Sequence, residues 1–179
     1  MNIHPLFVHF PIGMLVAYSV LSIAAAIIPT LKRQTWVAPV SHFLIFTGVL
    51  AAGAAIVTGG MAEELIEDVN PRAYIIGLHE TFALATTLAY LILGASLFVR
   101  VFDQKGWGDR IVGSRAFLMR IWALKKHLAH LVLDTWLAPL LALIGLILIT
   151  ITGALGAAIV YGPNIDPTAS LIYHLFWVQ

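Results

Sequence analysis

The sequence predicts an all-α integral membrane protein, a bundle of four transmembrane helices with an amphipathic interfacial helix between the third and fourth spans. Hydrophobic residues make up 60% of the chain and charged residues only 11%, whereas roughly a quarter of the residues of a soluble domain are charged. Four apolar stretches reach the ~20 residues that cross a bilayer. Nine of the ten Lys and Arg residues fall into two of the gaps between these stretches.

The four spans are expected at residues 9–28, 40–61, 74–102 and 137–161. Pro11 is tolerated in the opening turn of the first span, where backbone N–H groups lack helical partners. Pro29 ends that span, and Gly162 with Pro163 ends the fourth. The spans leave little of the chain over, so residues 1–179 are expected to form a single transmembrane domain without a separate catalytic domain.

The interfacial helix is expected within residues 109–134, where apolar and basic side chains alternate. The apolar members are Ile111, Phe117, Leu118, Ile121, Trp122, Leu124 and Leu128, and the basic members are Arg110, Arg115, Arg120, Lys125 and Lys126. A basic amphipathic helix of this kind lies in the plane of the membrane interface.

Orientation follows from the basic residues, because loops rich in Lys and Arg stay in the cytoplasm. The gaps after the first and third spans are basic, and the gap after the second span holds only Arg72. The sequence therefore predicts a bacterial inner-membrane protein with both termini in the periplasm. The N-terminus lacks the positive region of a signal peptide, so its first helix is expected to be retained. The net charge of +1 suggests no nucleic-acid partner.

The chain contains no cysteine. Disulfides, thiolate metal sites and covalent haem attachment are thereby excluded from it. Any metal would have to be held by His, Asp, Glu or Met side chains.

The histidines divide by their expected depth. His9 opens the first span and His79 lies in the first turns of the third, and both spans start at the outer face. His4 and His174 are also expected on the outer side. His42 enters the second span from the inner face, and His127 and His130 lie in the basic segment.

Two neutral imidazoles on facing helices can hold haem iron as axial ligands, and this chemistry needs no cysteine. The sequence therefore predicts haem b bound by His9 and His79, with His4 as the reserve ligand. Gly13, Ala83 and Thr87 follow these histidines by one or two turns and would form smooth walls for a porphyrin. Glu80 or a carbonyl group would orient an imidazole.

Three alternatives stay open. His4, His9, His79 and Glu80, with Glu63 or Glu64, could hold a metal ion directly, and the chain could then serve metal binding or transport. The chain could instead bind no cofactor and be an accessory subunit of a larger membrane complex. A second haem at His42, with His127 or His130, is a further possibility.

The second and fourth spans resemble each other faintly. Each opens with Ala-Pro, at residues 38–39 and 138–139, and each carries Thr-Gly late, at residues 58–59 and 152–153. Chance or an old duplication can both produce this likeness.

The stretch from His4 to Gly13, HPLFVHFPIG, resembles the opening of a bacterial family of small four-span membrane proteins, the domain of unknown function 2231. The Thr58-Gly59 pair, His79 and the Gly-rich stretch ending at Tyr161 continue the resemblance along nearly the whole chain. The family's paired glycines are replaced here by Ala157 and Ala158. The resemblance implies four spans, and a haem or respiratory association through fusions of members to cytochrome c-like domains.

The predicted function is that of a small b-type cytochrome-like subunit, which carries electrons in or beside a respiratory or photosynthetic complex and is not an enzyme by itself. Its expected partners are the lipid bilayer and other membrane subunits of that complex. The acidic loop Glu63, Glu64, Glu67 and Asp68 could dock a basic, soluble periplasmic cytochrome, because complementary charge speeds encounter.

Overall fold

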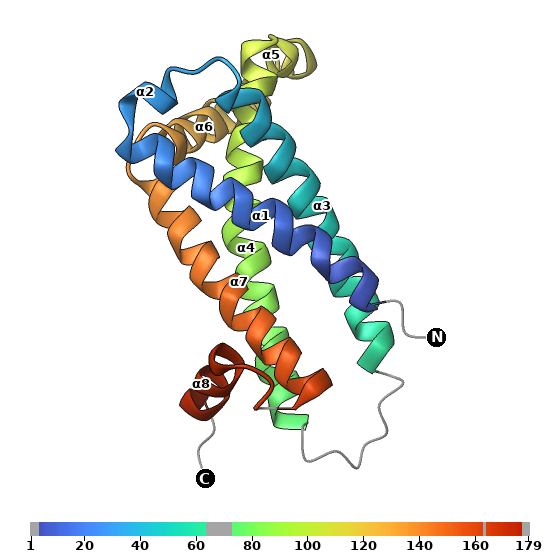
Figure 1. The fold of residues 1–179 in the computed structure, drawn as a ribbon. Helices are drawn as coiled ribbons and strands as arrows, with labels where there is room; N and C mark the ends of the chain where they lie inside the picture. Colours follow the sequence, from blue (N-terminus) through green and yellow to red (C-terminus); the bar gives the residue numbers. More distant parts are fainter. Residues whose placement is uncertain (1–3, 64–72, 163, 177–179) are drawn as a thin grey trace.

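The computed structural model describes residues 4–63, 73–162 and 164–176, which form helices joined by turns (Figure 1). Four helices are long and apolar enough to cross a membrane. They are α1 (His4–Ile27), α3 (Val37–Glu63), α4 (Ala73–Gln104) and α7 (Leu137–Tyr161). The expected four-span bundle is confirmed, and the span boundaries agree within a few residues except at the start of α1, which begins five residues before His9.

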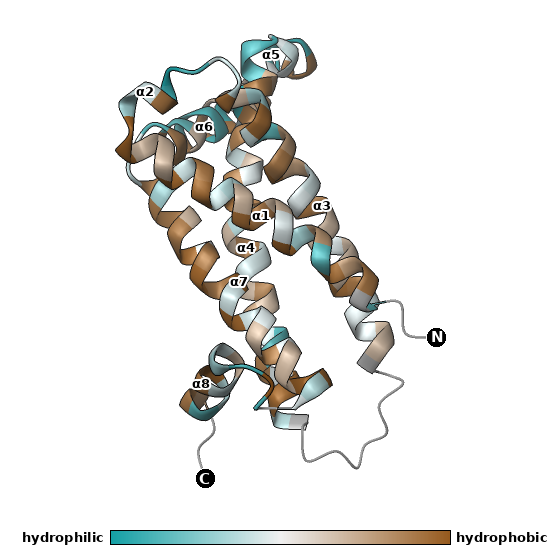
Figure 2. Cartoon of the chain, viewed as in Figure 1, coloured by the Kyte–Doolittle hydropathy of each residue, from teal (hydrophilic) through white to brown (hydrophobic). Residues whose placement is uncertain are grey.

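The bundle has two chemically different ends. At the histidine end, α1 and α4 begin and α3 and α7 finish. At the opposite, basic end lie α2 (Pro29–Lys32), α5 (Trp107–Val112) and α6 (Ala116–Leu133). Hydrophilic residues gather on α5 and α6, whereas the long helices are largely hydrophobic (Figure 2).

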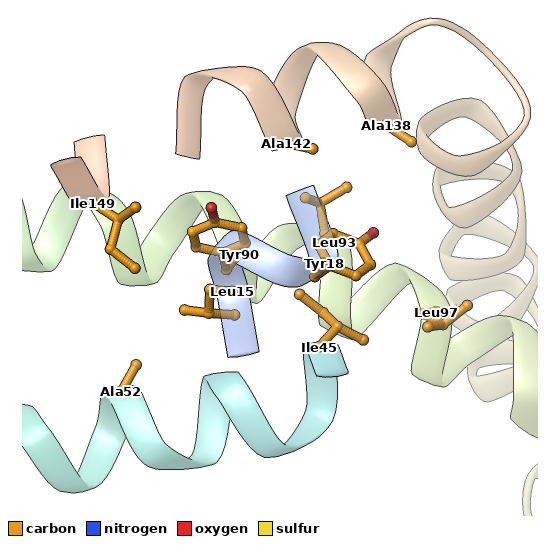
Figure 3. Close-up of a cluster of buried hydrophobic side chains, with 10 residues drawn as sticks. All are labelled: Leu15, Tyr18, Ile45, Ala52, Tyr90, Leu93, Leu97, Ala138, Ala142 and Ile149. Carbon is orange, nitrogen blue, oxygen red and sulfur yellow. The ribbon is translucent and has the colours of Figure 1, made fainter. Parts of the chain in front are cut away.

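The expected interfacial segment forms two helices rather than one. Gly113 separates α5 from α6 with a φ of 56°, in the left-handed region that glycine adopts without steric cost. α6 then runs crosswise to α4 and α7 (Figures 1 and 3). An amphipathic helix between the third and fourth spans is thus confirmed. This helix, α6, begins at Ala116, whereas the segment was expected to begin at residue 109.

The helix α8 (Pro167–Phe176) stands where the sequence suggested only an aromatic tail. Gly162, with a φ of 95°, turns the chain after α7. One carboxylate oxygen of Asp166 accepts hydrogen bonds from the backbone N–H groups of Thr168 and Ala169 at 2.8 and 3.0 Å. These bonds satisfy two N–H groups that a helix start leaves without partners.

The main core joins all four long helices (Figure 3). Its buried members are Leu15, Tyr18, Ile45, Ala52, Tyr90, Leu93, Leu97, Ala138, Ala142 and Ile149. At its centre the hydroxyl groups of Tyr90 and Ser19 form a buried hydrogen bond of 2.7 Å. This bond ties α4 to α1, the two helices that carry the histidines of interest.

A second, smaller core lies at the histidine end. Its buried members Ile75, Ala154, Leu155 and Ile172 come from α4, α7 and α8. Phe176 of α8 packs edge-on against Phe82 of α4, with ring centroids 5.1 Å apart. The described members of this core include none from α1 or α3. At this end, α1 and α3 are joined instead by the contact between His4 and Thr58.

The four long helices form two antiparallel pairs. α1 packs mainly against α3, and α4 mainly against α7. Across the pairs, α1 contacts α7 and α3 contacts α4. Figure 1 shows the two pairs diverging toward the histidine end. Each half of the chain thus contributes one helix hairpin. In both halves, the first helix of the hairpin contacts the second helix of the other hairpin.

Candidate functional site

His79 lies on α4. Its Nδ1 is 2.9 Å from the backbone carbonyl oxygen of Thr152 on α7, and the two atoms form a hydrogen bond. A carbonyl oxygen only accepts hydrogen bonds, so Nδ1 carries the proton. In the neutral ring the lone pair therefore lies on Nε2. Histidines that ligate metals are commonly fixed by such a second hydrogen bond.

The position of His79 on α4 is that of a core residue. Thr86, Tyr90 and Leu93 follow it by 7, 11 and 14 residues, spacings that return to the same side of a helix. All three are buried. His79 therefore stands at the histidine end of the stripe that α4 presents to the bundle.

His4 occupies a similar position on α1. Its Nδ1 lies 3.1 Å from the hydroxyl oxygen of Thr58 on α3. Because the Thr58 hydroxyl donates its own proton to the Ala54 carbonyl at 3.0 Å, its oxygen is the acceptor for the His4 ring. Burial lowers the pKa of His4, an effect that a hydrogen bond with the Ala55 carbonyl partly offsets.

Glycines lie against both rings. A Cβ added at Gly59 would lie 3.3 Å from Cε1 of His4, and a Cβ added at Gly156 would lie 3.2 Å from Cε1 of His79. Both distances are closer than a side chain normally tolerates. The glycines thus let each ring settle against the backbone of the second helix in its own half.

One of these two imidazoles comes from each half of the chain. His4 contacts the hydroxyl group of Thr58, whereas His79 contacts the backbone carbonyl of Thr152. Both threonines of the faint sequence repeat therefore contact a histidine, but of its two glycines only Gly59 lies against a ring.

His9 lies on a different side of α1 from His4. Its side chain is exposed and forms no hydrogen bond or ion pair with the described residues. Leu15 and Tyr18 of the core follow His4 by 11 and 14 residues, so His4 shares their side of α1. His9 lies five residues after His4, about 140° further around the helix. The pairing of His9 with His79 stays a prediction, and the position of His4 on the core side of α1 makes it the alternative partner.

The other expected wall residues are distributed unevenly. Gly13 is exposed, and a Cβ there would have nothing within 4 Å. Ala83 and Thr87 are half-buried, and the Thr87 hydroxyl donates to the Ala83 carbonyl at 2.9 Å. Glu80 is exposed. Any role of these residues toward a cofactor stays a prediction.

A pocket of about 250 Å³ lies between α1 and α7. Its lining includes Ile12 and Val16 of α1 and Gly153 and Ala157 of α7. His9 precedes Ile12 by three residues, so the pocket adjoins the side of α1 that carries His9. Small-molecule sites usually span roughly 300–1,000 Å³, and this pocket lies just below that range.

The described residues contain no group of three or more His, Asp or Glu side chains that could hold a metal ion directly. The acidic loop predicted to dock a soluble carrier falls on residues 64–72, apart from Glu63, and these lie outside the described residues. Two histidines suffice for haem iron, which takes its other four ligands from the porphyrin.

At the basic end, the three remaining histidines are engaged differently. Nδ1 of His130 pairs with Asp134 at 2.8 Å, and Asp134 also binds Arg100 at 2.6 Å. His42 packs beside Phe46 and interacts electrostatically with Arg100. His127 is exposed. A cation thus stands beside His42, and the described geometry joins neither His127 nor His130 to it as a second ligand.

The family model described as "Predicted membrane protein (DUF2231)" matches residues 1–168. The chain belongs to this family. It matches no curated protein and no solved structure. Membership of DUF2231 confirms the resemblance found in the HPLFVHFPIG opening and agrees with the four apolar helices.

The DUF2231 match covers both halves of the site, from His4 to the Thr152-Gly153 pair. Sequence reasoning missed Thr58, Thr152, Gly59 and Gly156 as members of the site. The repeated Thr-Gly pair was the available signal, because it occurs late in the second helix of each half.

Proposed function

We propose that this DUF2231 protein binds one b-type haem at the histidine end, with His4 and His79 as axial ligands, and carries electrons within or beside a larger membrane complex. One observation carries the proposal. One imidazole from each half of the chain stands at the histidine end of the bundle, and the Nδ1 of each contacts the second helix of its own half.

The donor set suits a b-type haem. Both imidazoles lie on the sides of α1 and α4 that face the bundle interior. Helical bundles hold flat cofactors with ligands placed in this way. His79 keeps a lone pair on Nε2, the atom that a second hydrogen bond at Nδ1 leaves for a metal. His4 and His79 would hold the haem iron, one from each half of the chain.

When bound, a b-type haem would supply one-electron oxidation and reduction at its iron. The chain's own residues would set the conditions for this chemistry. Thr58 and the Thr152 carbonyl would fix the rotation of the two rings, because each bond restrains one imidazole. Gly59 and Gly156, which have no side chain, would leave room for the His4 and His79 rings to lie against α3 and α7. The apolar spans would exclude bulk water from the site.

We also propose that the protein lies in a bacterial inner membrane, with the histidine end toward the periplasm. The distribution of Lys and Arg supports this orientation, since the basic end holds nine of the ten. A soluble periplasmic electron carrier and neighbouring membrane subunits are then the natural redox partners.

Three single substitutions test the ligand assignment. We expect His4→Ala and His79→Ala to lose haem, or to retain only five-coordinate haem, in the purified membrane protein. His9→Ala is the matched control, because it removes an exposed histidine from the same helix as His4. Haem per chain by the pyridine assay and the optical spin state are the readouts.

Two results would overturn this assignment. Loss of haem in His9→Ala but not in His4→Ala would restore the pairing of His9 with His79. A chain that stays colourless in all forms, yet co-purifies with a large complex, would instead be a cofactor-free accessory subunit.

A further inference from the structure

The helix α6 presents an apolar stripe away from the protein. Its members Phe117, Ile121, Leu124, Leu128 and Leu131 are 36–72% exposed. They follow one another by four, three, four and three residues, the spacing that keeps side chains on one side of a helix. An exposed apolar stripe on a helix of this length calls for a partner surface.

The opposite side of α6 is attached to the protein, which fixes the direction in which the stripe points. Ala129 is buried, and the ring of Trp122 packs onto Gly108 of α5, where an added Cβ would overlap it. Lys126 pairs with Asp103 of α4 at 3.1 Å and with Asp109 of α5 at 3.8 Å. The helix cannot roll about its axis without breaking these contacts.

Positive charge at the basic end exceeds what the protein itself neutralises. Its three carboxylates, Asp103, Asp109 and Asp134, are all in ion pairs with Arg100, Lys126 or His130. The other basic residues there are exposed and have no carboxylate within ion-pair distance among the described residues. They are Lys32, Arg33, Lys105, Arg110, Arg115, Arg120 and Lys125.

Two of these cations flank the stripe. Arg120 and Lys125 lie on opposite sides of it, about 60° and 80° respectively around the helix from its centre between Leu124 and Leu128. A side chain at such a position can place its charge at headgroup level while the stripe enters the acyl region. The remaining cations extend the positive surface over α2 and α5.

We infer that α6 lies in the membrane interface and binds anionic phospholipid headgroups in preference to zwitterionic ones. The stripe supplies the insertion, and Arg120 and Lys125 supply the headgroup selectivity. The partner is the lipid surface, because the stripe and the cations lie together beside the ends of the membrane spans. This inference is independent of any haem at the other end.

Lipid selectivity can be measured by electron paramagnetic resonance on the full chain in phosphatidylcholine bilayers, with spin-labelled phosphatidylglycerol or spin-labelled phosphatidylcholine as the probe. We expect the anionic lipid to be preferred by on the order of fivefold, since a cation near the surface contributes about that factor. Arg120→Gln with Lys125→Gln should bring the two lipids close to parity. Lys32→Gln with Arg33→Gln removes the same charge away from the stripe and should leave most of the preference.

Equal association of the two lipids with the unmodified chain would overturn the inference and would leave an acidic partner protein as the occupant of this surface. An equal loss in both double variants would also overturn it, because selectivity would then reflect overall charge rather than α6.

The absence of native cysteine permits a second measurement with single spin labels on α6. A label at Leu124→Cys should collide with oxygen and be protected from a water-soluble nickel reagent. A label at the neighbouring Lys125→Cys should show the reverse. Equal access of the nickel reagent to both labels would contradict insertion of the stripe.

Discussion

The Nδ1–H group of His79 donates a hydrogen bond to the backbone carbonyl of Thr152, 2.9 Å away on the neighbouring span. This contact fixes the tautomer of the ring and joins the start of α4 to the late Thr-Gly pair of α7. His4 makes the corresponding contact with Thr58 in the other half. Each helix hairpin therefore contributes one histidine and one threonine contact that positions its ring.

Gly156→Ala should disturb the His79 side of this site. The new methyl group would lie 3.2 Å from Cε1 of His79, and overpacking of this kind typically costs about 1–3 kcal/mol. We expect weaker haem retention, measured as haem per chain after detergent dilution. Gly153→Ala is the matched control, since a Cβ there meets nothing within 4 Å. Equal retention in both variants would show that the ring does not need the space at Gly156.

Gly145→Ala should destabilise the centre of the bundle. A Cβ at this position would lie 2.7 Å from the ring of Tyr90, which is fully buried and cannot swing aside. We expect a loss of about 1–3 kcal/mol in reversible unfolding by sodium dodecyl sulfate in mixed micelles. At Gly94 the nearest atoms are 3.6 Å away, so Gly94→Ala should be tolerated. A stable Gly145→Ala protein would mean that α4 and α7 pack less closely here.

Tyr90→Phe should remove the hydrogen bond that joins α4 to α1. The Ser19 hydroxyl is fully buried, and loss of its partner should cost about 1 kcal/mol of unfolding free energy. Tyr161→Phe removes an exposed hydroxyl and should have little effect in the same assay. If the two variants behave alike, the Ser19–Tyr90 bond does not stabilise the bundle.

The tie between α4 and α6 should weaken in acid. Hydrogen bonds from His130 and then from Arg100 lower the pKa of Asp134 below its usual value of 3.8. A carboxylate with a lowered pKa stabilises the fold above its unfolded-state pKa, and this stabilisation is lost as the pH falls through the folded-state pKa. Because Asp134 is exposed, the contribution should be about 0.5 kcal/mol.

Asp134→Asn measures this contribution. At pH 7 the variant should unfold slightly more easily than the unmodified chain, and the difference should shrink as the pH is lowered below 3.8. A difference that stays constant down to pH 2 would assign the effect to packing rather than to the ionised carboxylate. Unfolding at fixed ionic strength keeps salt screening constant across the series.

Span number, order and approximate limits could be predicted from the sequence, because length and hydropathy dominate the behaviour of a chain in a bilayer. The helix α8 could not, since it is too short to give a spanning signal and depends on the turn at Gly162 and the cap at Asp166. The break between α5 and α6 was also missed. Its only sign is Gly113, and a glycine does not reveal its φ in the sequence.

The ligand assignments stay predictions. In the sequence, His9 was preferred to His4 because the first span was expected to begin at residue 9, which left His4 outside any helix. Once α1 is extended to residue 4, the 11- and 14-residue spacings to Leu15 and Tyr18 place His4 on the core side. The Thr-Gly pairs could not be assigned to the site from the sequence, because their role depends on contacts between helices that the sequence does not show.

Haem binding by the chain can be measured from the dithionite-reduced minus oxidised absorption spectrum of the detergent-purified protein, combined with a pyridine assay for haem. We expect sharp reduced α and Soret bands and a content close to one haem per chain, as for a bis-histidine b-type cytochrome. A protein that is folded, produced with ample haem supply and still colourless would contradict this expectation.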